Sequence, residues 1–345
     1  MQRALATALL LTVAALSPLH AAAWDEVNLT LPGWHGDGIA YSGYRVGQNP
    51  DRGLYPSQAQ ILEDLKLLAK SWKVIRLYSA DQHAEDVLAV IAREKLVLKV
   101  MLGVWLDGKP EKLNANSLQI VRAIRLANAY PDLVAAVNVG NEILVSWSDH
   151  RLTEDQAERY VATVKASVHC PVTIADDTLY WRDPAGKLAK DIDFITMHTY
   201  PMWNREDIDT ALASTIHNYE AVRAAQPGKT VVIGEAGWAT FADSPKTLPS
   251  AATQAKQQRY YQELIAWAKA SGVTVFVFEA FDEPWKGNGT EGHWGIFDES
   301  RKPKQVMESL YPELVTAPNP ALESGAQTPQ TIEPGETPGT RKNKD

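Results

Sequence analysis

Eight short apolar runs recur along the chain, and this repetition constrains the fold more than any other feature of the sequence. The runs lie at 38–41, 74–78, 96–101, 134–139, 172–175, 194–197, 231–233 and 273–278. Each is short, and most are rich in β-branched residues, as expected of strands that are buried on both faces. The sequence therefore predicts eight core strands.

Amphipathic stretches with helical spacing separate these runs. Thr153 and Gln156 form a capping-box pattern at the start of one such stretch, and another, at 255–270, ends before Gly272. Strands that alternate with helices imply parallel strands joined by crossover helices. Eight such units match the size of a (β/α)8 TIM barrel. The alternative is a doubly wound open sheet, but no glycine-rich phosphate loop follows the first predicted strand.

Both ends of the chain differ in composition from the part between them. Residues 1–23 have the pattern of a signal peptide, with Arg3 before an apolar run at 4–16 that is too short to span a bilayer. Residues 317–345 are rich in Pro, Gly, Thr and Glu, which predicts a disordered tail. We expect a catalytic barrel at 24–316, exported to the periplasm or secreted, with no integral membrane segment after cleavage. The alternative for the leader is an uncleaved anchor.

Charge and cysteine content exclude some classes of partner. The chain has 34 Lys and Arg against 42 Asp and Glu, a net charge of −8, which argues against a nucleic-acid-binding surface. The single cysteine cannot form an internal disulfide. We expect a monomer that needs no cofactor and no metal.

The residues that follow the predicted strands indicate where chemistry occurs, because barrel enzymes carry their active sites at the carboxyl ends of the strands. These positions are rich in carboxylates and aromatic rings, a combination typical of carbohydrate sites, where rings pack on sugar faces and carboxylates bind hydroxyls. They include Tyr41, Arg76, Tyr78, Asp81, Trp105, Asn141, Glu142, Asp176, Asp177, His198, Tyr200, Glu235, Trp238, Glu279, Asp282, Glu283, Trp285 and Lys286.

Two of the carboxylates suit a pair of catalytic groups. Glu142 follows the fourth strand and Glu235 the seventh, so both side chains can reach one bond across the barrel mouth. Retaining glycosidases hold two such carboxyl groups about 5–5.5 Å apart, whereas inverting enzymes separate them by about 6.5–9.5 Å. The spacing in sequence leaves both options open. Asn141 is suited to bind the hydroxyl next to the reacting carbon.

The chain resembles glycoside hydrolase family 17, the β-1,3-glucanase family, and most closely its bacterial branch. The resemblance covers 38–310 and depends on the order of the motifs GIAYSGY, VIRLYSAD, VNVGNE, VIGEAGW, FEAFDEPWK and HWGIF. It implies a (β/α)8 barrel and a retaining double displacement on β-glucan. It further implies that Glu142 is the acid/base and Glu235 the nucleophile, so that Glu142 must hold a proton while Glu235 stays ionised.

Further substrate contacts are predicted around this pair. The resemblance implies them for Tyr41, Tyr78, Tyr200, Glu283 and Lys286. The positions after the strands add Asn141, His198, Trp238 and Trp285. We expect Tyr200 to donate a hydrogen bond to Glu235, and Trp285, in a polar loop, to be a platform for a sugar ring. His198 is predicted either to contact substrate or a catalytic glutamate, or to be a core histidine.

Three alternatives to β-1,3-glucan hydrolysis stay open at this point. The same chemistry can transfer the sugar to another glucan, as a β-1,3-glucanosyltransferase does. A non-catalytic glucan-binding protein is the second, and both glutamates argue against it. A metal-dependent hydrolase is the third, although the sequence has no His-x-His or HExxH spacing. The sequence also has no G-x-S-x-G motif, which argues against a serine hydrolase.

Overall fold

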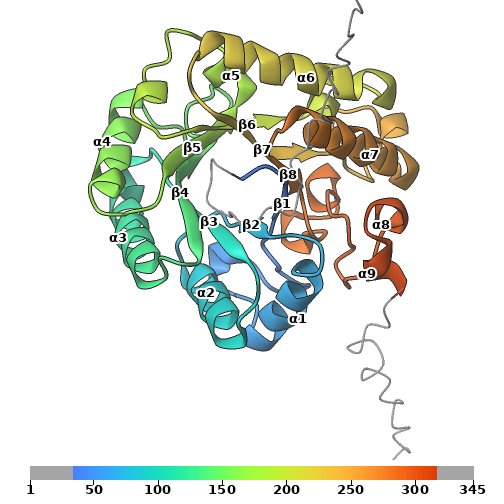
Figure 1. The fold of residues 1–345 in the computed structure, drawn as a ribbon, viewed down its shortest axis with the longest axis horizontal. Helices are drawn as coiled ribbons and strands as arrows, with labels where there is room; N and C mark the ends of the chain where they lie inside the picture. Colours follow the sequence, from blue (N-terminus) through green and yellow to red (C-terminus); the bar gives the residue numbers. More distant parts are fainter. Residues whose placement is uncertain (1–33, 317–345) are drawn as a thin grey trace, which may run out of the picture.

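Eight parallel strands close into a barrel in chain order in the computed structural model, which describes residues 34–316 (Figure 1). The predicted (β/α)8 barrel is confirmed. The strands are β1 (Asp37–Ala40), β2 (Val74–Arg76), β3 (Lys99–Val104), β4 (Val134–Asn141), β5 (Val172–Asp177), β6 (Ile195–Thr199), β7 (Val231–Gly237) and β8 (Val275–Phe278). The predicted signal peptide at 1–23 and the tail at 317–345 lie outside the described residues.

The first and last strands complete the ring. Ile39 of β1 is aligned with Ile75 of β2 on one side and with Val277 of β8 on the other. Every strand therefore has two neighbours, so the sheet has no exposed edge.

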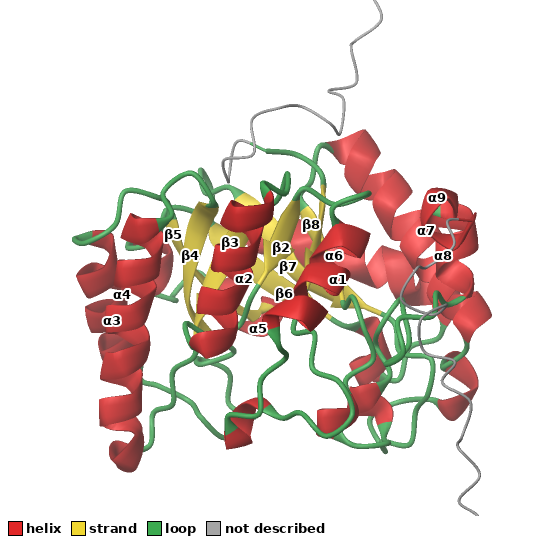
Figure 2. Ribbon diagram, turned by 90° about the horizontal axis from the view of Figure 1, so that it is seen from below, coloured by secondary structure: helices red, strands yellow, loops and turns green. Residues whose placement is uncertain are grey.

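Helices pack outside the strands (Figure 2). They are α1 (Gln58–Leu68), α2 (Gln82–Glu94), α3 (Leu113–Ala129), α4 (Glu154–Lys165), α5 (Thr178–Trp181), α6 (Ile208–Ala225), α7 (Gln254–Ser271), α8 (Gln305–Leu310) and α9 (Pro312–Thr316). The predicted capping box is present at Thr153 and Gln156, and Gly272 ends α7 in the left-handed conformation with φ of 63°. None of the helices within 34–316 combines the length and apolarity that a bilayer crossing requires.

The interior of the barrel is filled by side chains from several strands. A separate buried cluster contains Val74, Met101, Ala136, Val232 and Phe276 together with Trp34, Ala135 and Phe194. Gly38 makes room for this cluster, because a Cβ atom there would lie 2.5 Å from the ring of Phe276. The filled interior supports the strand ends on which the site is built.

Three predicted strands begin later than expected, and the one at 96–101 differs most. The apolar run at 96–101 was predicted to be strand throughout, but β3 starts at Lys99. The amide of Leu96 donates to the carbonyl of Ile91 and completes the end of α2, and Val97 is 64% exposed. The run therefore contains a helix terminus as well as a strand, which apolar content alone does not separate.

A buried ion pair connects the beginning of the barrel to the segment after β8. Both carboxylate oxygens of Asp64, on α1, accept hydrogen bonds from Arg301 at 2.8 and 2.7 Å. Arg301 also donates to the carbonyl of Gly43 at 2.8 Å, and Asp64 is 0% exposed. This bidentate geometry joins segments that are 237 residues apart in sequence.

Candidate active site

A cavity of about 1120 Å³ lies at the carboxyl ends of the strands. Glu142 and Glu235 both line it, as do Asn141, Tyr78 and Tyr200. The residues predicted from the fourth and seventh strands are thus brought into one cavity, as the barrel topology requires.

Glu235 lies on β7 and is 4% exposed. One carboxylate oxygen accepts hydrogen bonds from the guanidinium of Arg76 and from the hydroxyl of Tyr78, the latter at 3.0 Å. The other oxygen accepts a hydrogen bond from the hydroxyl of Tyr200, as the sequence predicted. Burial raises the pKa of Glu235, but the electrostatic effects of His198 and Arg76 and these donated hydrogen bonds outweigh it and lower the pKa to about 2.

Glu142 lies at the turn that follows β4, and its side chain is 28% exposed. Its backbone φ of 49° is in the left-handed region, which a residue other than glycine rarely adopts. The turn is held by a hydrogen bond from the Glu142 amide to the carbonyl of Ala175 at 2.9 Å. A second one runs from the amide of Leu144 to the buried carboxylate of Asp176 at 2.8 Å. Such backbone strain is characteristic of functional sites.

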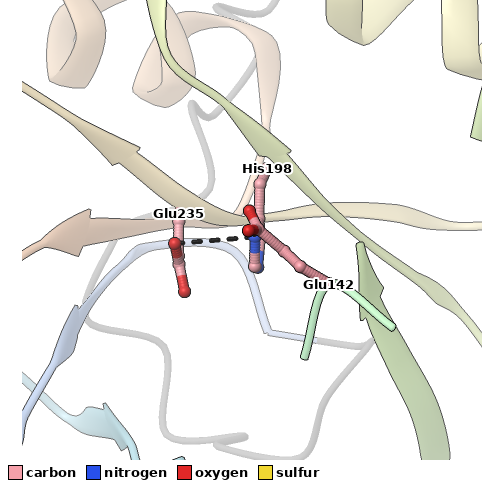
Figure 3. A group of neighbouring side chains, drawn as sticks. All are labelled: Glu142, His198 and Glu235. Atoms are coloured by element: carbon pink, nitrogen blue, oxygen red, sulfur yellow. Dashed lines mark hydrogen bonds and ion pairs between the residues drawn. The ribbon is translucent and has the colours of Figure 1, made fainter. Parts of the chain in front are cut away.

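His198 lies between the two glutamates (Figure 3). Its Nδ1 is 3.0 Å from an oxygen of Glu142 and 3.5 Å from an oxygen of Glu235. One oxygen of each carboxylate and a ring nitrogen of His198 all lie within 4.8 Å of one another. The two carboxylates are therefore closer than the roughly 6.5–9.5 Å that an inverting enzyme needs to admit water.

Glu142, His198 and Glu235 also have the ligand atoms of a metal site. The groups around them show whether a metal ion fits there. Glu235 already accepts hydrogen bonds from Arg76 and from two tyrosine hydroxyls. A divalent cation beside Glu235 would be close to the guanidinium of Arg76 and would be repelled by it. The donor set fits a pair of carboxylates bridged by a histidine better than a metal site.

Arg76 is the functional residue to which sequence reasoning assigned no role. It is 0% exposed, and besides contacting Glu235 it donates hydrogen bonds to Asn141 at 2.6 Å and to Tyr78 at 3.0 Å. The signal was an arginine within the apolar run VIRLY, because a buried guanidinium must have a buried partner.

A second ionic cluster borders the cavity after β8. Glu283, which is 2% exposed, forms an ion pair with Lys286 and accepts a hydrogen bond from the indole of Trp285 at 3.1 Å. All three line the cavity, and Trp285 and Lys286 belong to the 3-10 turn Pro284–Lys286. These three predicted substrate contacts are thus assembled at one side of the cavity.

The structure corrects the predicted contact of Trp238, and that of Tyr41 stays a prediction. Trp238 is 0% exposed, packs on Tyr260, and donates its indole hydrogen to the carbonyl of Ala251, so its ring is a core residue and faces no substrate. Tyr41 borders the cavity but is only 1% exposed, and its hydroxyl donates to Asp64 at 3.2 Å. Its hydroxyl is therefore engaged by the buried ion pair rather than directed to a ligand.

Two exposed tryptophans line the cavity instead. Trp105, at the end of β3, is 40% exposed, and Trp147, in the loop after β4, is 50% exposed. The ring of Trp105 stacks on His150 with centroids 4.7 Å apart, and Nε2 of His150 lies 2.8 Å from the carbonyl of Asn141. The sequence placed Trp105 after the third strand without predicting a sugar contact for it, and gave no signal for Trp147, because sequence does not distinguish an exposed tryptophan from a buried one.

The geometry can be compared with known proteins. The BtgE/BtgC glycoside hydrolase domain family matches residues 38–295. The chain belongs to this family. Its relatives include a putative glucan endo-1,3-beta-glucosidase btgC of Aspergillus niger, 29% identical over 275 residues, which cover 72% of this chain and 40% of that protein. A glucan 1,3-beta-glucosidase of Arthroderma benhamiae is 27% identical over 76% of this chain and 88% of that protein. The chain thus spans less than half the length of the Aspergillus relative.

Solved structures agree with the BtgE/BtgC assignment. An endo-laminarinase from Formosa Hel1_33_131 is similar with a TM-score of 0.72 and 27% identity, over 81% of this chain and 87% of that one. A glycoside hydrolase family 17 β-1,3-glucanosyltransferase from Rhizomucor miehei has a TM-score of 0.65 and 25% identity, over 78% of this chain and 95% of that one. The predicted resemblance to glycoside hydrolase family 17 is confirmed, and its bacterial branch stays a prediction.

Proposed function

We propose that the chain is a retaining glycosidase that cleaves β-1,3-glucan by double displacement. The observation that carries this proposal is the close approach of the Glu142 and Glu235 carboxylates, within 4.8 Å, in two different environments. Glu235 is buried, held by an arginine and two tyrosines, and remains ionised. Glu142 is partly exposed to the cavity. A fixed anion and a more accessible carboxyl group are the two components that a retaining mechanism requires.

In the first step, a carboxylate oxygen of Glu235 attacks the anomeric carbon as the bond to the leaving oxygen breaks. Glu142 gives its proton to that oxygen, so the leaving sugar departs as a neutral alcohol. In the second step, Glu142 takes a proton from water, whose oxygen attacks the anomeric carbon and releases Glu235. The two inversions give net retention.

The neighbours of the pair have separate tasks in this scheme. Arg76, Tyr78 and Tyr200 keep Glu235 ionised and fix its direction. His198, which contacts both carboxylates, keeps them at a constant separation. Fixed donors of this kind need no reorganisation as charge moves during the reaction.

The proposed substrate follows from the rings, the charged cluster and the relatives. Trp105, Trp147 and Trp285 line the cavity and offer faces on which sugar rings can pack. Glu283 and Lys286 offer acceptors and donors for hydroxyl groups. The names of the relatives refer to 1,3-beta-glucosidases and a laminarinase, and one solved neighbour is a complex with laminaritriose.

The test replaces Glu235 by glutamine and follows cleavage of a linear β-1,3-glucan. Loss of about 10³-fold or more in kcat is expected because the nucleophile is removed while the amide preserves the shape of the site. Exposed Glu158→Gln on α4 is the matched control and should leave the rate unchanged. Nuclear magnetic resonance of the first product should detect the β-anomer. An α-anomer, or full activity of Glu235→Gln, would refute the proposal.

Transfer to a second glucan is the other candidate function. The exposed rings of Trp105 and Trp147 favour it, because an acceptor sugar packed there would compete with water for the glycosyl-enzyme. Mass spectrometry of products from a short β-1,3-glucan donor separates the two functions. Products longer than the donor indicate transfer, and products that are only shorter indicate hydrolysis.

We further propose that the protein is exported as a monomer after removal of residues 1–23. The apolar run and small residues at 21–23 support cleavage there. Amino-terminal sequencing of protein recovered outside the cytoplasm should start near Trp24, and an intact leader on that protein would contradict the proposal.

A further inference from the structure

Three carboxyl groups that are almost fully buried lie near the carboxyl ends of β7 and β8. They belong to Glu235, Glu279 and Glu283, which are 4%, 2% and 2% exposed. Two permanently charged cations face them, the guanidinium of Arg76 and the ammonium of Lys286, whereas the ring of His198 beside Glu235 is shared with a fourth carboxyl group, that of Glu142. Because uncompensated buried charge is costly, the group is stable when one of the three carboxyl groups carries a proton.

Two of the three carboxyl groups are stabilised as anions. Glu235 accepts a hydrogen bond from Arg76 as well as those from two tyrosines. Glu283 forms an ion pair with Lys286 and accepts a hydrogen bond from Trp285 at 3.1 Å. Each therefore pairs closely with a cation and accepts at least one further hydrogen bond.

Glu279 has no such set of donors. Its Oε1 lies 3.6 Å from Nζ of Lys286, and within residues 34–316 this buried oxygen has no hydrogen-bond partner. Glu283 pairs with the same Nζ of Lys286, so the carboxyl groups of Glu279 and Glu283 lie beside one ammonium group. Burial, followed by the negative charge of Glu283, raises the pKa of Glu279 well above its usual range.

We propose that Glu279 is a positioning residue that carries a proton in the working enzyme and donates it in a hydrogen bond to Glu283. The role of this hydrogen bond in substrate binding rests on the function proposed above. The hydrogen bond leaves Lys286 to pair with Glu283 alone, so both side chains keep their orientation at the cavity wall. If Glu279 were ionised, two anions would compete for Lys286, and a third negative charge would lie near Glu235.

The state of Glu279 depends on every charged group around it. Glu283 and Lys286 are the nearest, and Glu235 acts from β7. At longer range the groups that interact with it are Tyr78, Tyr261 and Lys304. As pH rises through the raised pKa of Glu279, we expect the proton to leave and KM to increase.

Infrared spectroscopy tests the proton directly, with no substrate present. The difference spectrum between wild type and Glu279→Gln near neutral pH should contain the C=O stretching band of a protonated carboxylic acid. The control Glu308→Gln, at an exposed position on α8, should not remove that band. If the spectrum of Glu279→Gln lacks no such band relative to the wild type, the proposal is overturned.

Kinetics on β-1,3-glucan tests the positioning role. Glutamine keeps an N–H donor toward Glu283, so Glu279→Gln should change KM by less than about threefold and lose the alkaline rise in KM. Leucine removes the donor, so Glu279→Leu should raise KM about tenfold or more, with a smaller effect on kcat.

Equal KM values for the two variants would overturn the positioning role, and if the leucine variant does not fold, the glutamine variant decides through its pH profile. A wild type that has the infrared band but cleaves no β-1,3-glucan would refute the proposed function and leave the assignment of the proton intact.

Discussion

Replacement of Arg76 by methionine would measure how Glu235, the proposed nucleophile, is kept charged. Methionine fills much of the arginine volume but removes the buried cation beside Glu235 and the hydrogen bonds to Tyr78 and Asn141. The pKa of Glu235 is about 2 in the folded protein, against an ordinary value of 4.5. This depression corresponds to about 3 kcal/mol of preferential stabilisation of the ionised form. Arg76 is one of the two main charges responsible, together with His198.

The sign of the stability effect follows from the depressed pKa. A carboxyl group with a lowered folded-state pKa stabilises the fold above its unfolded pKa, and this contribution is lost as pH falls from 4.5 toward 2. Arg76→Met should therefore cost about 3–5 kcal/mol at pH 7, the range for breaking a buried pair. The difference from wild type should narrow as pH falls below 4.5, because wild type then loses its advantage. Urea unfolding at several pH values measures both.

The pH profile of kcat/KM gives a second readout. In wild type, Glu235 stays ionised down to about pH 2 and sets no acid limb in the usual assay range. In Arg76→Met, burial is less well compensated, so an acid limb should appear above pH 4.5. Arg223→Met is the matched control, because Arg223 forms an exposed pair with Glu220, and it should cost less than about 1 kcal/mol with no change in profile. An Arg76→Met enzyme with wild-type stability and a wild-type acid limb would refute the reasoning.

Three further substitutions give sharp expectations. Tyr200→Phe removes a donor to Glu235 and should lower kcat about tenfold while raising the pH of the acid limb, which a pH profile of kcat/KM would detect. Trp105→Ala should raise KM for long glucans and reduce any transfer products with little change in stability, as measured by kinetics and product sizing. Burial raises the pKa of Asp176 to about 7, so wild-type stability should fall as pH rises from about 4 to 7, and Asp176→Asn should flatten that slope in urea unfolding. A slope that Asp176→Asn leaves unchanged would contradict the buried, protonated state of that carboxyl group.

The eight strands were predictable because each is a short apolar run with a turn on either side, and burial on both faces leaves no other pattern. The start of the third strand, after Leu96, was not predictable in this way. Its run looks uniform in sequence, but its first residues complete α2 and only Lys99 begins β3. Apolar content reports burial, whereas the boundary depends on which backbone carbonyl each amide reaches.

The convergence of Glu142 and Glu235 in one cavity was predictable for a topological reason, and the residues around them were not. Glu142 and Glu235 must converge once both follow strands of one barrel. The ion pair of Arg76 with Glu235 joins residues 159 positions apart. The only sign of it in the sequence is an arginine within an apolar run. Trp238 and Trp105 are both tryptophans that directly follow a strand. Trp238 is nevertheless 0% exposed, whereas Trp105 is 40% exposed. That difference arises from how the loops and helices pack around each ring, which the strand pattern does not contain.

The buried pair of Arg301 with Asp64 has a consequence for synthesis of the chain. Its two partners are 237 residues apart, and the pairing of β1 with β8 spans a comparable distance. Contacts of such long range repay the entropy of loop closure only late in folding. A nascent chain that has emerged as far as β7 therefore displays two open strand edges, to which other chains can add. A premature stop before β8 would leave both edges open permanently, and we expect such a truncated chain to aggregate; a stop between β8 and Arg301 would leave the buried Asp64 without its Arg301 partner.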